Sequence, residues 1–377
     1  MNPYLLWLRS GVRTALGCGS LALLLAATTP GSTNAQAPAE STIRVSAGTH
    51  LRATAGRSVG QDQDRIGFGI RRARIRFDAR LQGGPSLFAQ LAGGAGSVSL
   101  LDFYATYQVT PALRVRAGRM VSAQPRAFVM TSMFQIDGTD RPAVAEQWGR
   151  TTIGADGRDF GIDARLVSGP VEVVLFVHNG DGSWDRTRGN YRESVSGGNA
   201  TRSVERTAIA VTGAVTFRPA FLQGLELGGF SGYNPADNPN TAVGDRGRAY
   251  ITYGGHAYFG ANPGSKRFRA KADLIAITYE SLPGVNVQNS LGISLFGAVG
   301  LTRESELYAR AESLQQDSRS EDDPGGYFAA GLSFSPSAGR GQPYQRERIT
   351  LEYGRFKGGE LNAESENLLI VQLQLAF

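Results

Sequence analysis

Cysteine is almost missing from this sequence of 377 residues, which contains only Cys18. Cys18 lies in an N-terminal segment that we expect to be removed. The rest of the chain can then form no disulfide and no zinc–thiolate site, and it has no cysteine nucleophile. Histidine is also scarce, with His50, His178 and His256 as its three examples. We predict no metal site and no cofactor.

A hydrophobic run long enough for a membrane-spanning helix is missing as well. The apolar run of residues 15–27 follows Arg9 and Arg13 and ends in small residues, whereas a spanning helix needs about 20 apolar residues. The pattern predicts a secretory signal peptide over residues 1–37, cleaved after the AQA sequence at its end. Residues 38–377 then form the exported protein.

Neither a strong charge excess nor a domain boundary is evident. The formal charge of +6 falls to +4 when the two arginines of the predicted signal peptide are removed, which is too small an excess to indicate nucleic-acid binding. No linker divides the exported residues into the soluble domains of about 150 residues that this length usually implies. Short segments of alternating polarity recur instead, separated by turn residues.

Arginine alternates with apolar residues over residues 71–81. Successive side chains of a strand point to opposite faces, so one face of this segment is cationic and the other is apolar. An arginine that faces lipid costs roughly 2–4 kcal/mol at the bilayer midplane, and we therefore place the alternating arginines inside a barrel. Arg71 breaks the alternation and is expected at a strand end or a bulge.

About sixteen alternating segments can be counted, an even number as in bacterial transmembrane barrels. We predict an all-β fold, a transmembrane antiparallel β-barrel of about 16 strands formed by residues 38–377. Aromatic residues on the apolar face lie mostly near strand ends, as membrane-interface girdles do. They are Phe103, Tyr107, Phe217, Tyr253, Phe259, Phe328, Phe334 and Tyr353. A soluble β-sandwich also alternates and is the alternative fold.

The last ten residues alternate in polarity and end in Phe377. This ending is similar to the C-terminal strand that outer-membrane assembly machinery recognises. We therefore predict the outer membrane of a Gram-negative-type bacterium as the location, with outer-membrane lipid and the barrel-assembly machinery, through Phe377, as partners.

Basic residues are predicted to line the interior, because sixteen strands leave a water-filled channel. The predicted pore-lining residues are Arg72, Arg74, Arg76, Arg80, Arg114, Arg116, Arg269 and Lys271. Rings of basic side chains favour anions, and the arginine fork suits carboxylate and phosphate oxygens. In the alternative interpretation, these side chains pair with carboxylates of the interior and only rigidify the wall.

Four stretches carry a resemblance to a known family: RRARIRFDARL, LLDFYATYQVTPALRVRAGR, GRDFGIDARL and the closing LLIVQLQLAF. With them, the sequence resembles the phosphate-selective porins O and P. The resemblance implies a sixteen-stranded outer-membrane barrel, usually a homotrimer, which conducts small anions past an arginine ladder and an inward-folded constriction loop. Arg72, Arg74 and Arg76 match the ladder.

Residues 121–151 are the candidate constriction loop, with Arg126 and Arg141 as possible constriction charges; an ordinary external loop is the alternative. Members of the family commonly continue the AGR segment with a lysine and a proline, but this chain reads AGRMVSAQPRAF. Selection of phosphate through a lysine and a less selective anion channel therefore both stay open.

The predicted function is an outer-membrane porin for passive diffusion of small anions, such as phosphate, chloride or organic anions. A structural or adhesive barrel without selective transport is the alternative, since it would not need a cationic interior. An enzyme is not predicted, because none of the three histidines lies in a pattern that pairs it with a serine nucleophile.

Overall fold

The computed structural model describes residues 41–58, 64–82, 84–94, 96–153, 156–180, 209–235, 249–282, 286–315, 317–318, 325–357 and 365–377. The predicted signal peptide lies outside these residues. The described strands are β1 (Thr42–Ser58), β2 (Asp64–Arg80), β3 (Ser86–Gly94), β4 (Ser97–Gln108), β5 (Leu113–Met120), β6 (Asp159–Ser168), β7 (Val171–His178), β8 (Ala210–Phe217), β9 (Leu225–Asn234), β10 (Tyr250–Phe259), β11 (Phe268–Leu282), β12 (Asn286–Gly300), β13 (Ser305–Gln315), β14 (Gly325–Phe334), β15 (Glu347–Lys357) and β16 (Glu366–Ala376). The short helices are η1 (Met133–Gln135), α2 (Ala143–Thr151) and α4 (Pro336–Gly339).

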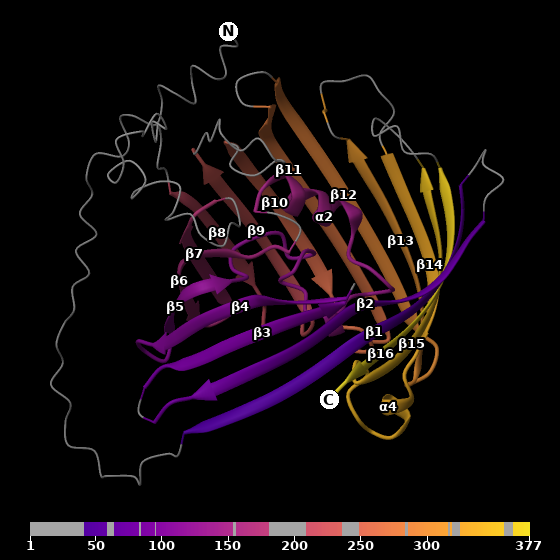
Figure 1. The fold of residues 1–377 in the computed structure, drawn as a ribbon, viewed down its shortest axis with the longest axis horizontal. Coiled ribbons are helices and arrows are strands. Elements are labelled where there is room, and N and C mark those ends of the chain that lie inside the picture. The colour runs from indigo at the N-terminus through magenta and orange to yellow at the C-terminus, as the bar shows by residue number, and fades with distance from the viewer. Residues whose placement is uncertain are drawn as a thin grey trace, which may run out of the picture. The chain divides into compact units, whose positions relative to one another are not determined.

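The sixteen strands form one closed antiparallel barrel in which each strand pairs with its neighbours in sequence (Figure 1). β1 and β16 close the barrel, with Gly48 paired to Ala376. Beyond that pair, the amides of Ala47 and Phe377 each donate to the carbonyl of the other, at 3.2 and 2.8 Å. The predicted fold and strand number are confirmed.

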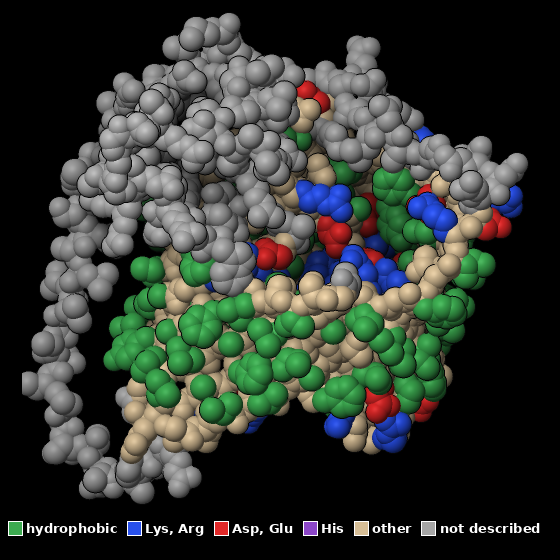
Figure 2. All heavy atoms as spheres, in the orientation of Figure 1, with side chains coloured by type: hydrophobic (Ala, Val, Ile, Leu, Met, Phe, Trp, Pro, Cys, Tyr) green, Lys and Arg blue, Asp and Glu red, His purple; other side chains and the backbone are tan. Residues whose placement is uncertain are grey.

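The two faces of the wall differ as the alternation predicts. Of the eight predicted girdle aromatics, all but Phe259 are exposed on the barrel. In β16, Gln372 and Gln374 are buried at 1% and 0% exposure, whereas Leu369 and Val371 are 49% and 44% exposed. Figure 2 shows hydrophobic side chains over the outer face and charged side chains gathered in the hollow above it. This apolar exterior is what a barrel in lipid requires.

No helix in the described part of the chain is long and apolar enough to cross a membrane.

A β-bulge in β2 accounts for the arginine that broke the alternation. His50 of β1 pairs with Arg72, but the next residue, Leu51, pairs with Ile70. Arg71 is therefore the extra residue of the bulge, as predicted, and a bulge redirects the side chain that it inserts. The bulge brings Arg71 and Arg72 to the same carboxylate, that of Asp140.

The described residues between β5 and β6, 121–153 and 156–158, fold into the barrel and are called the inner loop below. It contains η1 and α2. Trp148 of α2 is 1% exposed, packs edge-on against Phe230 of β9, and donates its indole N–H to Thr252 Oγ1 of β10 at 2.9 Å. Helix α2 of this loop therefore packs against the inner side of the wall.

Candidate functional site

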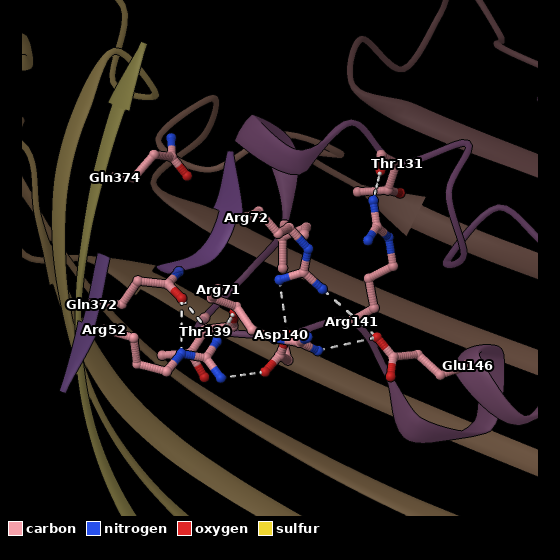
Figure 3. Close-up of polar contacts among 12 residues, drawn as sticks. Arg52, Arg71, Arg72, Thr131, Thr139, Asp140, Arg141, Glu146, Gln372 and Gln374 are labelled. Atoms are coloured by element: carbon pink, nitrogen blue, oxygen red, sulfur yellow. Dashed lines mark hydrogen bonds and ion pairs between the residues drawn. The ribbon is translucent and has the colours of Figure 1, made fainter. Parts of the chain in front are cut away.

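Asp140 of the inner loop accepts hydrogen bonds from three arginines of the wall (Figure 3). Its Oδ2 lies 2.7 Å from Arg52 Nη1, and its Oδ1 lies 2.9 Å from Arg71 Nε and 2.8 Å from Arg72 Nη1. Glu146 of α2 lies farther from the same arginines, with Oε1 3.8 Å from Arg71 Nη2 and 3.7 Å from Arg72 Nη2. These ion pairs fasten the loop to β1 and β2.

Asp137 makes a second attachment on another part of the wall. Its Oδ2 is 2.5 Å from Lys271 Nζ, and its Oδ1 is 2.7 Å from Arg269 Nη1, both on β11. Arg269 also binds Glu306 of β13, with 2.6 Å between Nη2 and Oε1. Arg269 and Lys271 are 3% and 8% exposed, so they are structural anchors of the loop.

A glycine allows a third attachment, to β15. Gly138 has a φ of +65°, and a Cβ at this position would lie 2.3 Å from Glu352 Oε2. The close approach lets Thr139 donate to Glu352 through its amide, at 3.1 Å, and its hydroxyl, at 2.5 Å. Arg348 of β15 also donates to the carbonyl of Ile136 at 2.8 Å. Residues 136–140 are thus bound on several sides.

The wall cations lower the pKa values of the two loop aspartates. Burial alone would raise the pKa of Asp140, but the charges of Arg72, Arg52 and Arg71 outweigh it and hold this pKa well below its usual range. Burial likewise opposes ionisation of Asp137, and Lys271 and Arg269 lower its pKa. Both carboxylates are therefore charged at neutral pH, and the ion pairs are complete.

We expect the attachment of the inner loop to be insensitive to pH over the neutral and mildly acidic range. A carboxyl with a depressed folded pKa contributes stability that is fully present above its unfolded pKa, about 3.9, and is lost as the pH falls through the folded value. Single-channel conductance should therefore stay constant from neutral pH to about pH 5 and rise only below about pH 4. A conductance change near pH 6 would contradict this assignment.

The two predicted constriction arginines have different partners. Arg126 Nε binds Glu226 Oε1 of β9 at 2.7 Å, so its charge is paired. Arg141 instead donates to the backbone carbonyls of Phe128, at 3.0 Å, and Thr131, at 2.9 Å. Its guanidinium forms no ion pair among the described residues.

The surroundings of Arg141 are cationic. Burial and the charges of Arg72, Arg158 and Arg74 lower its pKa well below the ordinary value, whereas Glu146 opposes the shift. An anion bound beside Arg141 would raise the pKa of its guanidinium, which the neighbouring cations lower. Burial and the neighbouring cations therefore disfavour the charged form of the Arg141 guanidinium.

The eight predicted pore-lining residues divide into two groups. Four are 3–8% exposed and carry an ion pair to a carboxylate: Arg72, Arg116, Arg269 and Lys271. The other four form no ion pair among the described residues: Arg74, Arg76, Arg80 and Arg114. The first group thus has the ion pairs that the wall-bracing interpretation expects, and the second group has none among the described residues.

Arg158 adds a cation that the alternation did not select, because it precedes β6. Its Nε lies 3.2 Å from both carboxylate oxygens of Asp102 on β4. Gln90 of β3 donates to Asp102 Oδ2 at 2.6 Å and accepts from Arg76 Nε at 2.6 Å. This network holds the Nε of the Arg76 guanidinium, which forms no ion pair with a carboxylate of the described chain.

The sequence reasoning missed the loop carboxylates, Asp137, Asp140 and Glu146. A signal was available, because residues 137–141 read DGTDR within a long loop of a barrel whose interior is rich in arginine. Opposite charge would have indicated that this loop contacts the wall. Which arginine each aspartate contacts depends on how the loop folds, and alternation along a strand does not report that.

The architecture defines a class of protein. A closed sixteen-stranded barrel with an apolar exterior and a charged interior, partly filled by an inner loop, is a transmembrane β-barrel of the outer-membrane class. No protein-family model matches the sequence, and no curated protein matches it. The resemblance to the phosphate-selective porins O and P therefore stays a prediction.

Solved structures with this fold are outer-membrane porins and channels. The anion-selective porin from Comamonas acidovorans is 15% identical, with a TM-score of 0.62 over 90% of this chain and 100% of that one. OmpF of Salmonella typhi, in complex with daunomycin, is 10% identical, with a TM-score of 0.58 over 89% of this chain and 97% of that one. The channel DcaP of Acinetobacter baumannii is 11% identical, with a TM-score of 0.54 over 89% and 97%. The likeness shows a shared fold.

Proposed function

We propose that this chain is an outer-membrane porin that allows passive diffusion of small anions. One observation carries the proposal: Arg74, Arg76, Arg80 and Arg114 form no ion pair in the described part of the barrel wall. Rings of unpaired basic side chains lower the energy of an anion in a pore and raise that of a cation. Arg141, on the inner loop, likewise forms no ion pair among the described residues and donates to backbone carbonyls.

The positions of these charges support a continuous path. Arg74, Arg76 and Arg80 share the inner face of β2 with Asp78, which lies between Arg76 and Arg80, and Arg114 lies on β5. Arg80 is at the end of β2, where it is exposed. An anion that passes the inner loop would meet one guanidinium after another, and each can bind carboxylate or phosphate oxygens through its fork of donors.

The proposal covers phosphate, chloride and organic anions as a class. The lysine that the family commonly carries after its AGR segment is missing here, and the paired Lys271 holds Asp137. A broad preference for anions is therefore proposed in place of dedicated phosphate selection.

We further propose a homotrimer, and assembly through recognition of the strand that ends in Phe377.

The structural or adhesive barrel is the second candidate, because many interior arginines are paired as wall braces. Swelling of proteoliposomes in a small neutral sugar separates the two. A porin should cause rapid swelling that is lost when the protein is heat-denatured before reconstitution. Swelling no faster than in protein-free liposomes would reject the porin and favour the structural barrel.

A further inference from the structure

We propose that the arginine path prefers planar aromatic carboxylates over non-aromatic anions of similar size, an inference that rests on the proposed anion porin. The observation is that aromatic rings from the wall and from the inner loop lie beside the unpaired Arg76. A ligand with a carboxylate and a flat ring could meet a guanidinium and an aromatic face at the same step.

The first ring comes from the inner loop. The guanidinium carbon of Arg76 lies 5.5 Å from the centroid of the Phe134 ring. Phe134 reaches this place because residue 48 of β1 is a glycine: a Cβ there would lie 2.2 Å from Phe134 Cζ. Gly48 pairs with Arg74 in the neighbouring strand, so Phe134 lies where two unpaired arginines project from β2.

Two further rings come from β3 and β4. Phe88 pairs with Tyr104 across these strands, and their rings stack with 5.0 Å between centroids and 29° between planes. Phe88 pairs directly with Asp78 and is a diagonal neighbour of Arg76, because Arg76 pairs with Gln90 two residues farther along β3. Side chains in this relation are within reach of one another when they are long or aromatic.

Tyr104 also lies beside an arginine of β5. The guanidinium carbon of Arg116 lies 5.0 Å from its ring centroid. Phe88, Tyr104, Phe134 and Arg76 are all only partly buried. Unlike side chains of a closed core, they can therefore be reached from the water-filled interior.

Other cations of the barrel interior that lie beside an aromatic ring are paired with a carboxylate. Arg269 lies 5.1 Å from the Phe296 ring and Lys271 lies 4.9 Å from the Tyr258 ring, but both cations are paired with Asp137. Those cations have no free charge for a ligand. Arg267 also lies near a ring, 5.7 Å from the centroid of Phe268, but that ring is exposed at 59%. At Arg76, a ring of the inner loop and a guanidinium that forms no ion pair among the described residues occur together, and this combination identifies the site.

The Arg76 guanidinium and the neighbouring aromatic rings offer a ligand two kinds of interaction. The carboxylate of the ligand would bind the free guanidinium N–H donors of Arg76, and its ring would stack against Phe88, Tyr104 or the guanidinium plane. Chloride and inorganic phosphate can use only the first interaction. A saturated ring of similar size can use the first but cannot stack as a flat face.

Benzoate and cyclohexanecarboxylate are the probes that isolate the aromatic contribution, since they have the same charge and nearly the same size. The full chain in a planar bilayer should show a benzoate permeability about threefold higher than that of cyclohexanecarboxylate in reversal-potential measurements against chloride. The variants Phe88→Leu and Tyr104→Leu should bring the ratio to about one while leaving the preference for chloride over potassium. Phe221→Leu, at a ring 86% exposed outside the interior, is the matched control and should keep the threefold ratio.

The outcomes separate the two proposals. Preference for chloride over potassium without discrimination between the two carboxylates would overturn this inference and leave the porin proposal standing. Equal discrimination in the wild-type protein and in both aromatic variants would also overturn it. Absence of any preference for chloride over potassium would reject the anion porin itself, and this inference with it.

Discussion

Replacing Arg74, Arg76 and Arg114 together with alanine is expected to remove most of the preference for chloride over potassium. None of the three is held by an ion pair in the described chain, so their charge acts on ions in the channel and their loss exposes no buried carboxylate. A charge of this kind, at a few ångströms in a wet channel, contributes about 1 kcal/mol to the energy of a passing ion. The permeability ratio should therefore fall at least fivefold, measured as the shift in reversal potential under a potassium chloride gradient.

Arg340→Ala is the matched control for this experiment. Arg340 is an exposed arginine beside α4, and it pairs with Glu347. Its loss removes one positive charge away from the arginine path, so it is compared with the effect per charge of the triple variant. An equal shift per charge in both variants would indicate a general charge effect and would contradict the assignment of the three arginines to the path.

Replacing Asp140 with asparagine is expected to detach the inner loop from β1 and β2 and to raise single-channel conductance. The substitution leaves Arg52, Arg71 and Arg72 without their shared carboxylate partner. These ion pairs are partly buried, so the cost should lie between the about 0–1 kcal/mol of an exposed pair and the about 3–5 kcal/mol of a buried one. Single-channel recording measures the conductance, and the temperature of heat modification on gels measures the stability.

The control for the loop is Glu347→Gln, which breaks the ion pair with Arg340 at an exposed site. Exposed pairs contribute about 0–1 kcal/mol, so conductance and heat modification should both stay at wild-type values. If Asp140→Asn had the same conductance and the same transition temperature as this control, Asp140 would not hold the loop.

The strands and their orientation could be predicted from sequence because alternation is a local property. In β2, each arginine of the even parity faces inward because the outward alternative puts a charge in lipid. The bulge was also predictable, since Arg71 breaks a strict alternation and a strand can absorb such a residue only at an end or a bulge. The pairing of Leu51 with Ile70 confirms it.

Alternation along the strands could not predict whether an interior arginine pairs with a carboxylate. Arg74 and Arg72 share a parity and a strand, yet Arg72 binds Asp140 and Arg74 has no carboxylate partner in the described chain. The difference depends on where residues 137–146 of the inner loop come to rest. That position depends on long-range contacts such as Trp148 with Thr252, and no local pattern records them.

The most direct test of the account is the reversal potential of the wild-type protein in a planar bilayer under a potassium chloride gradient. The account predicts channels whose reversal potential lies on the chloride side, because the unpaired arginines of the wall attract anions. A reversal potential on the potassium side, or a barrel that folds and inserts but forms no channels, would contradict it.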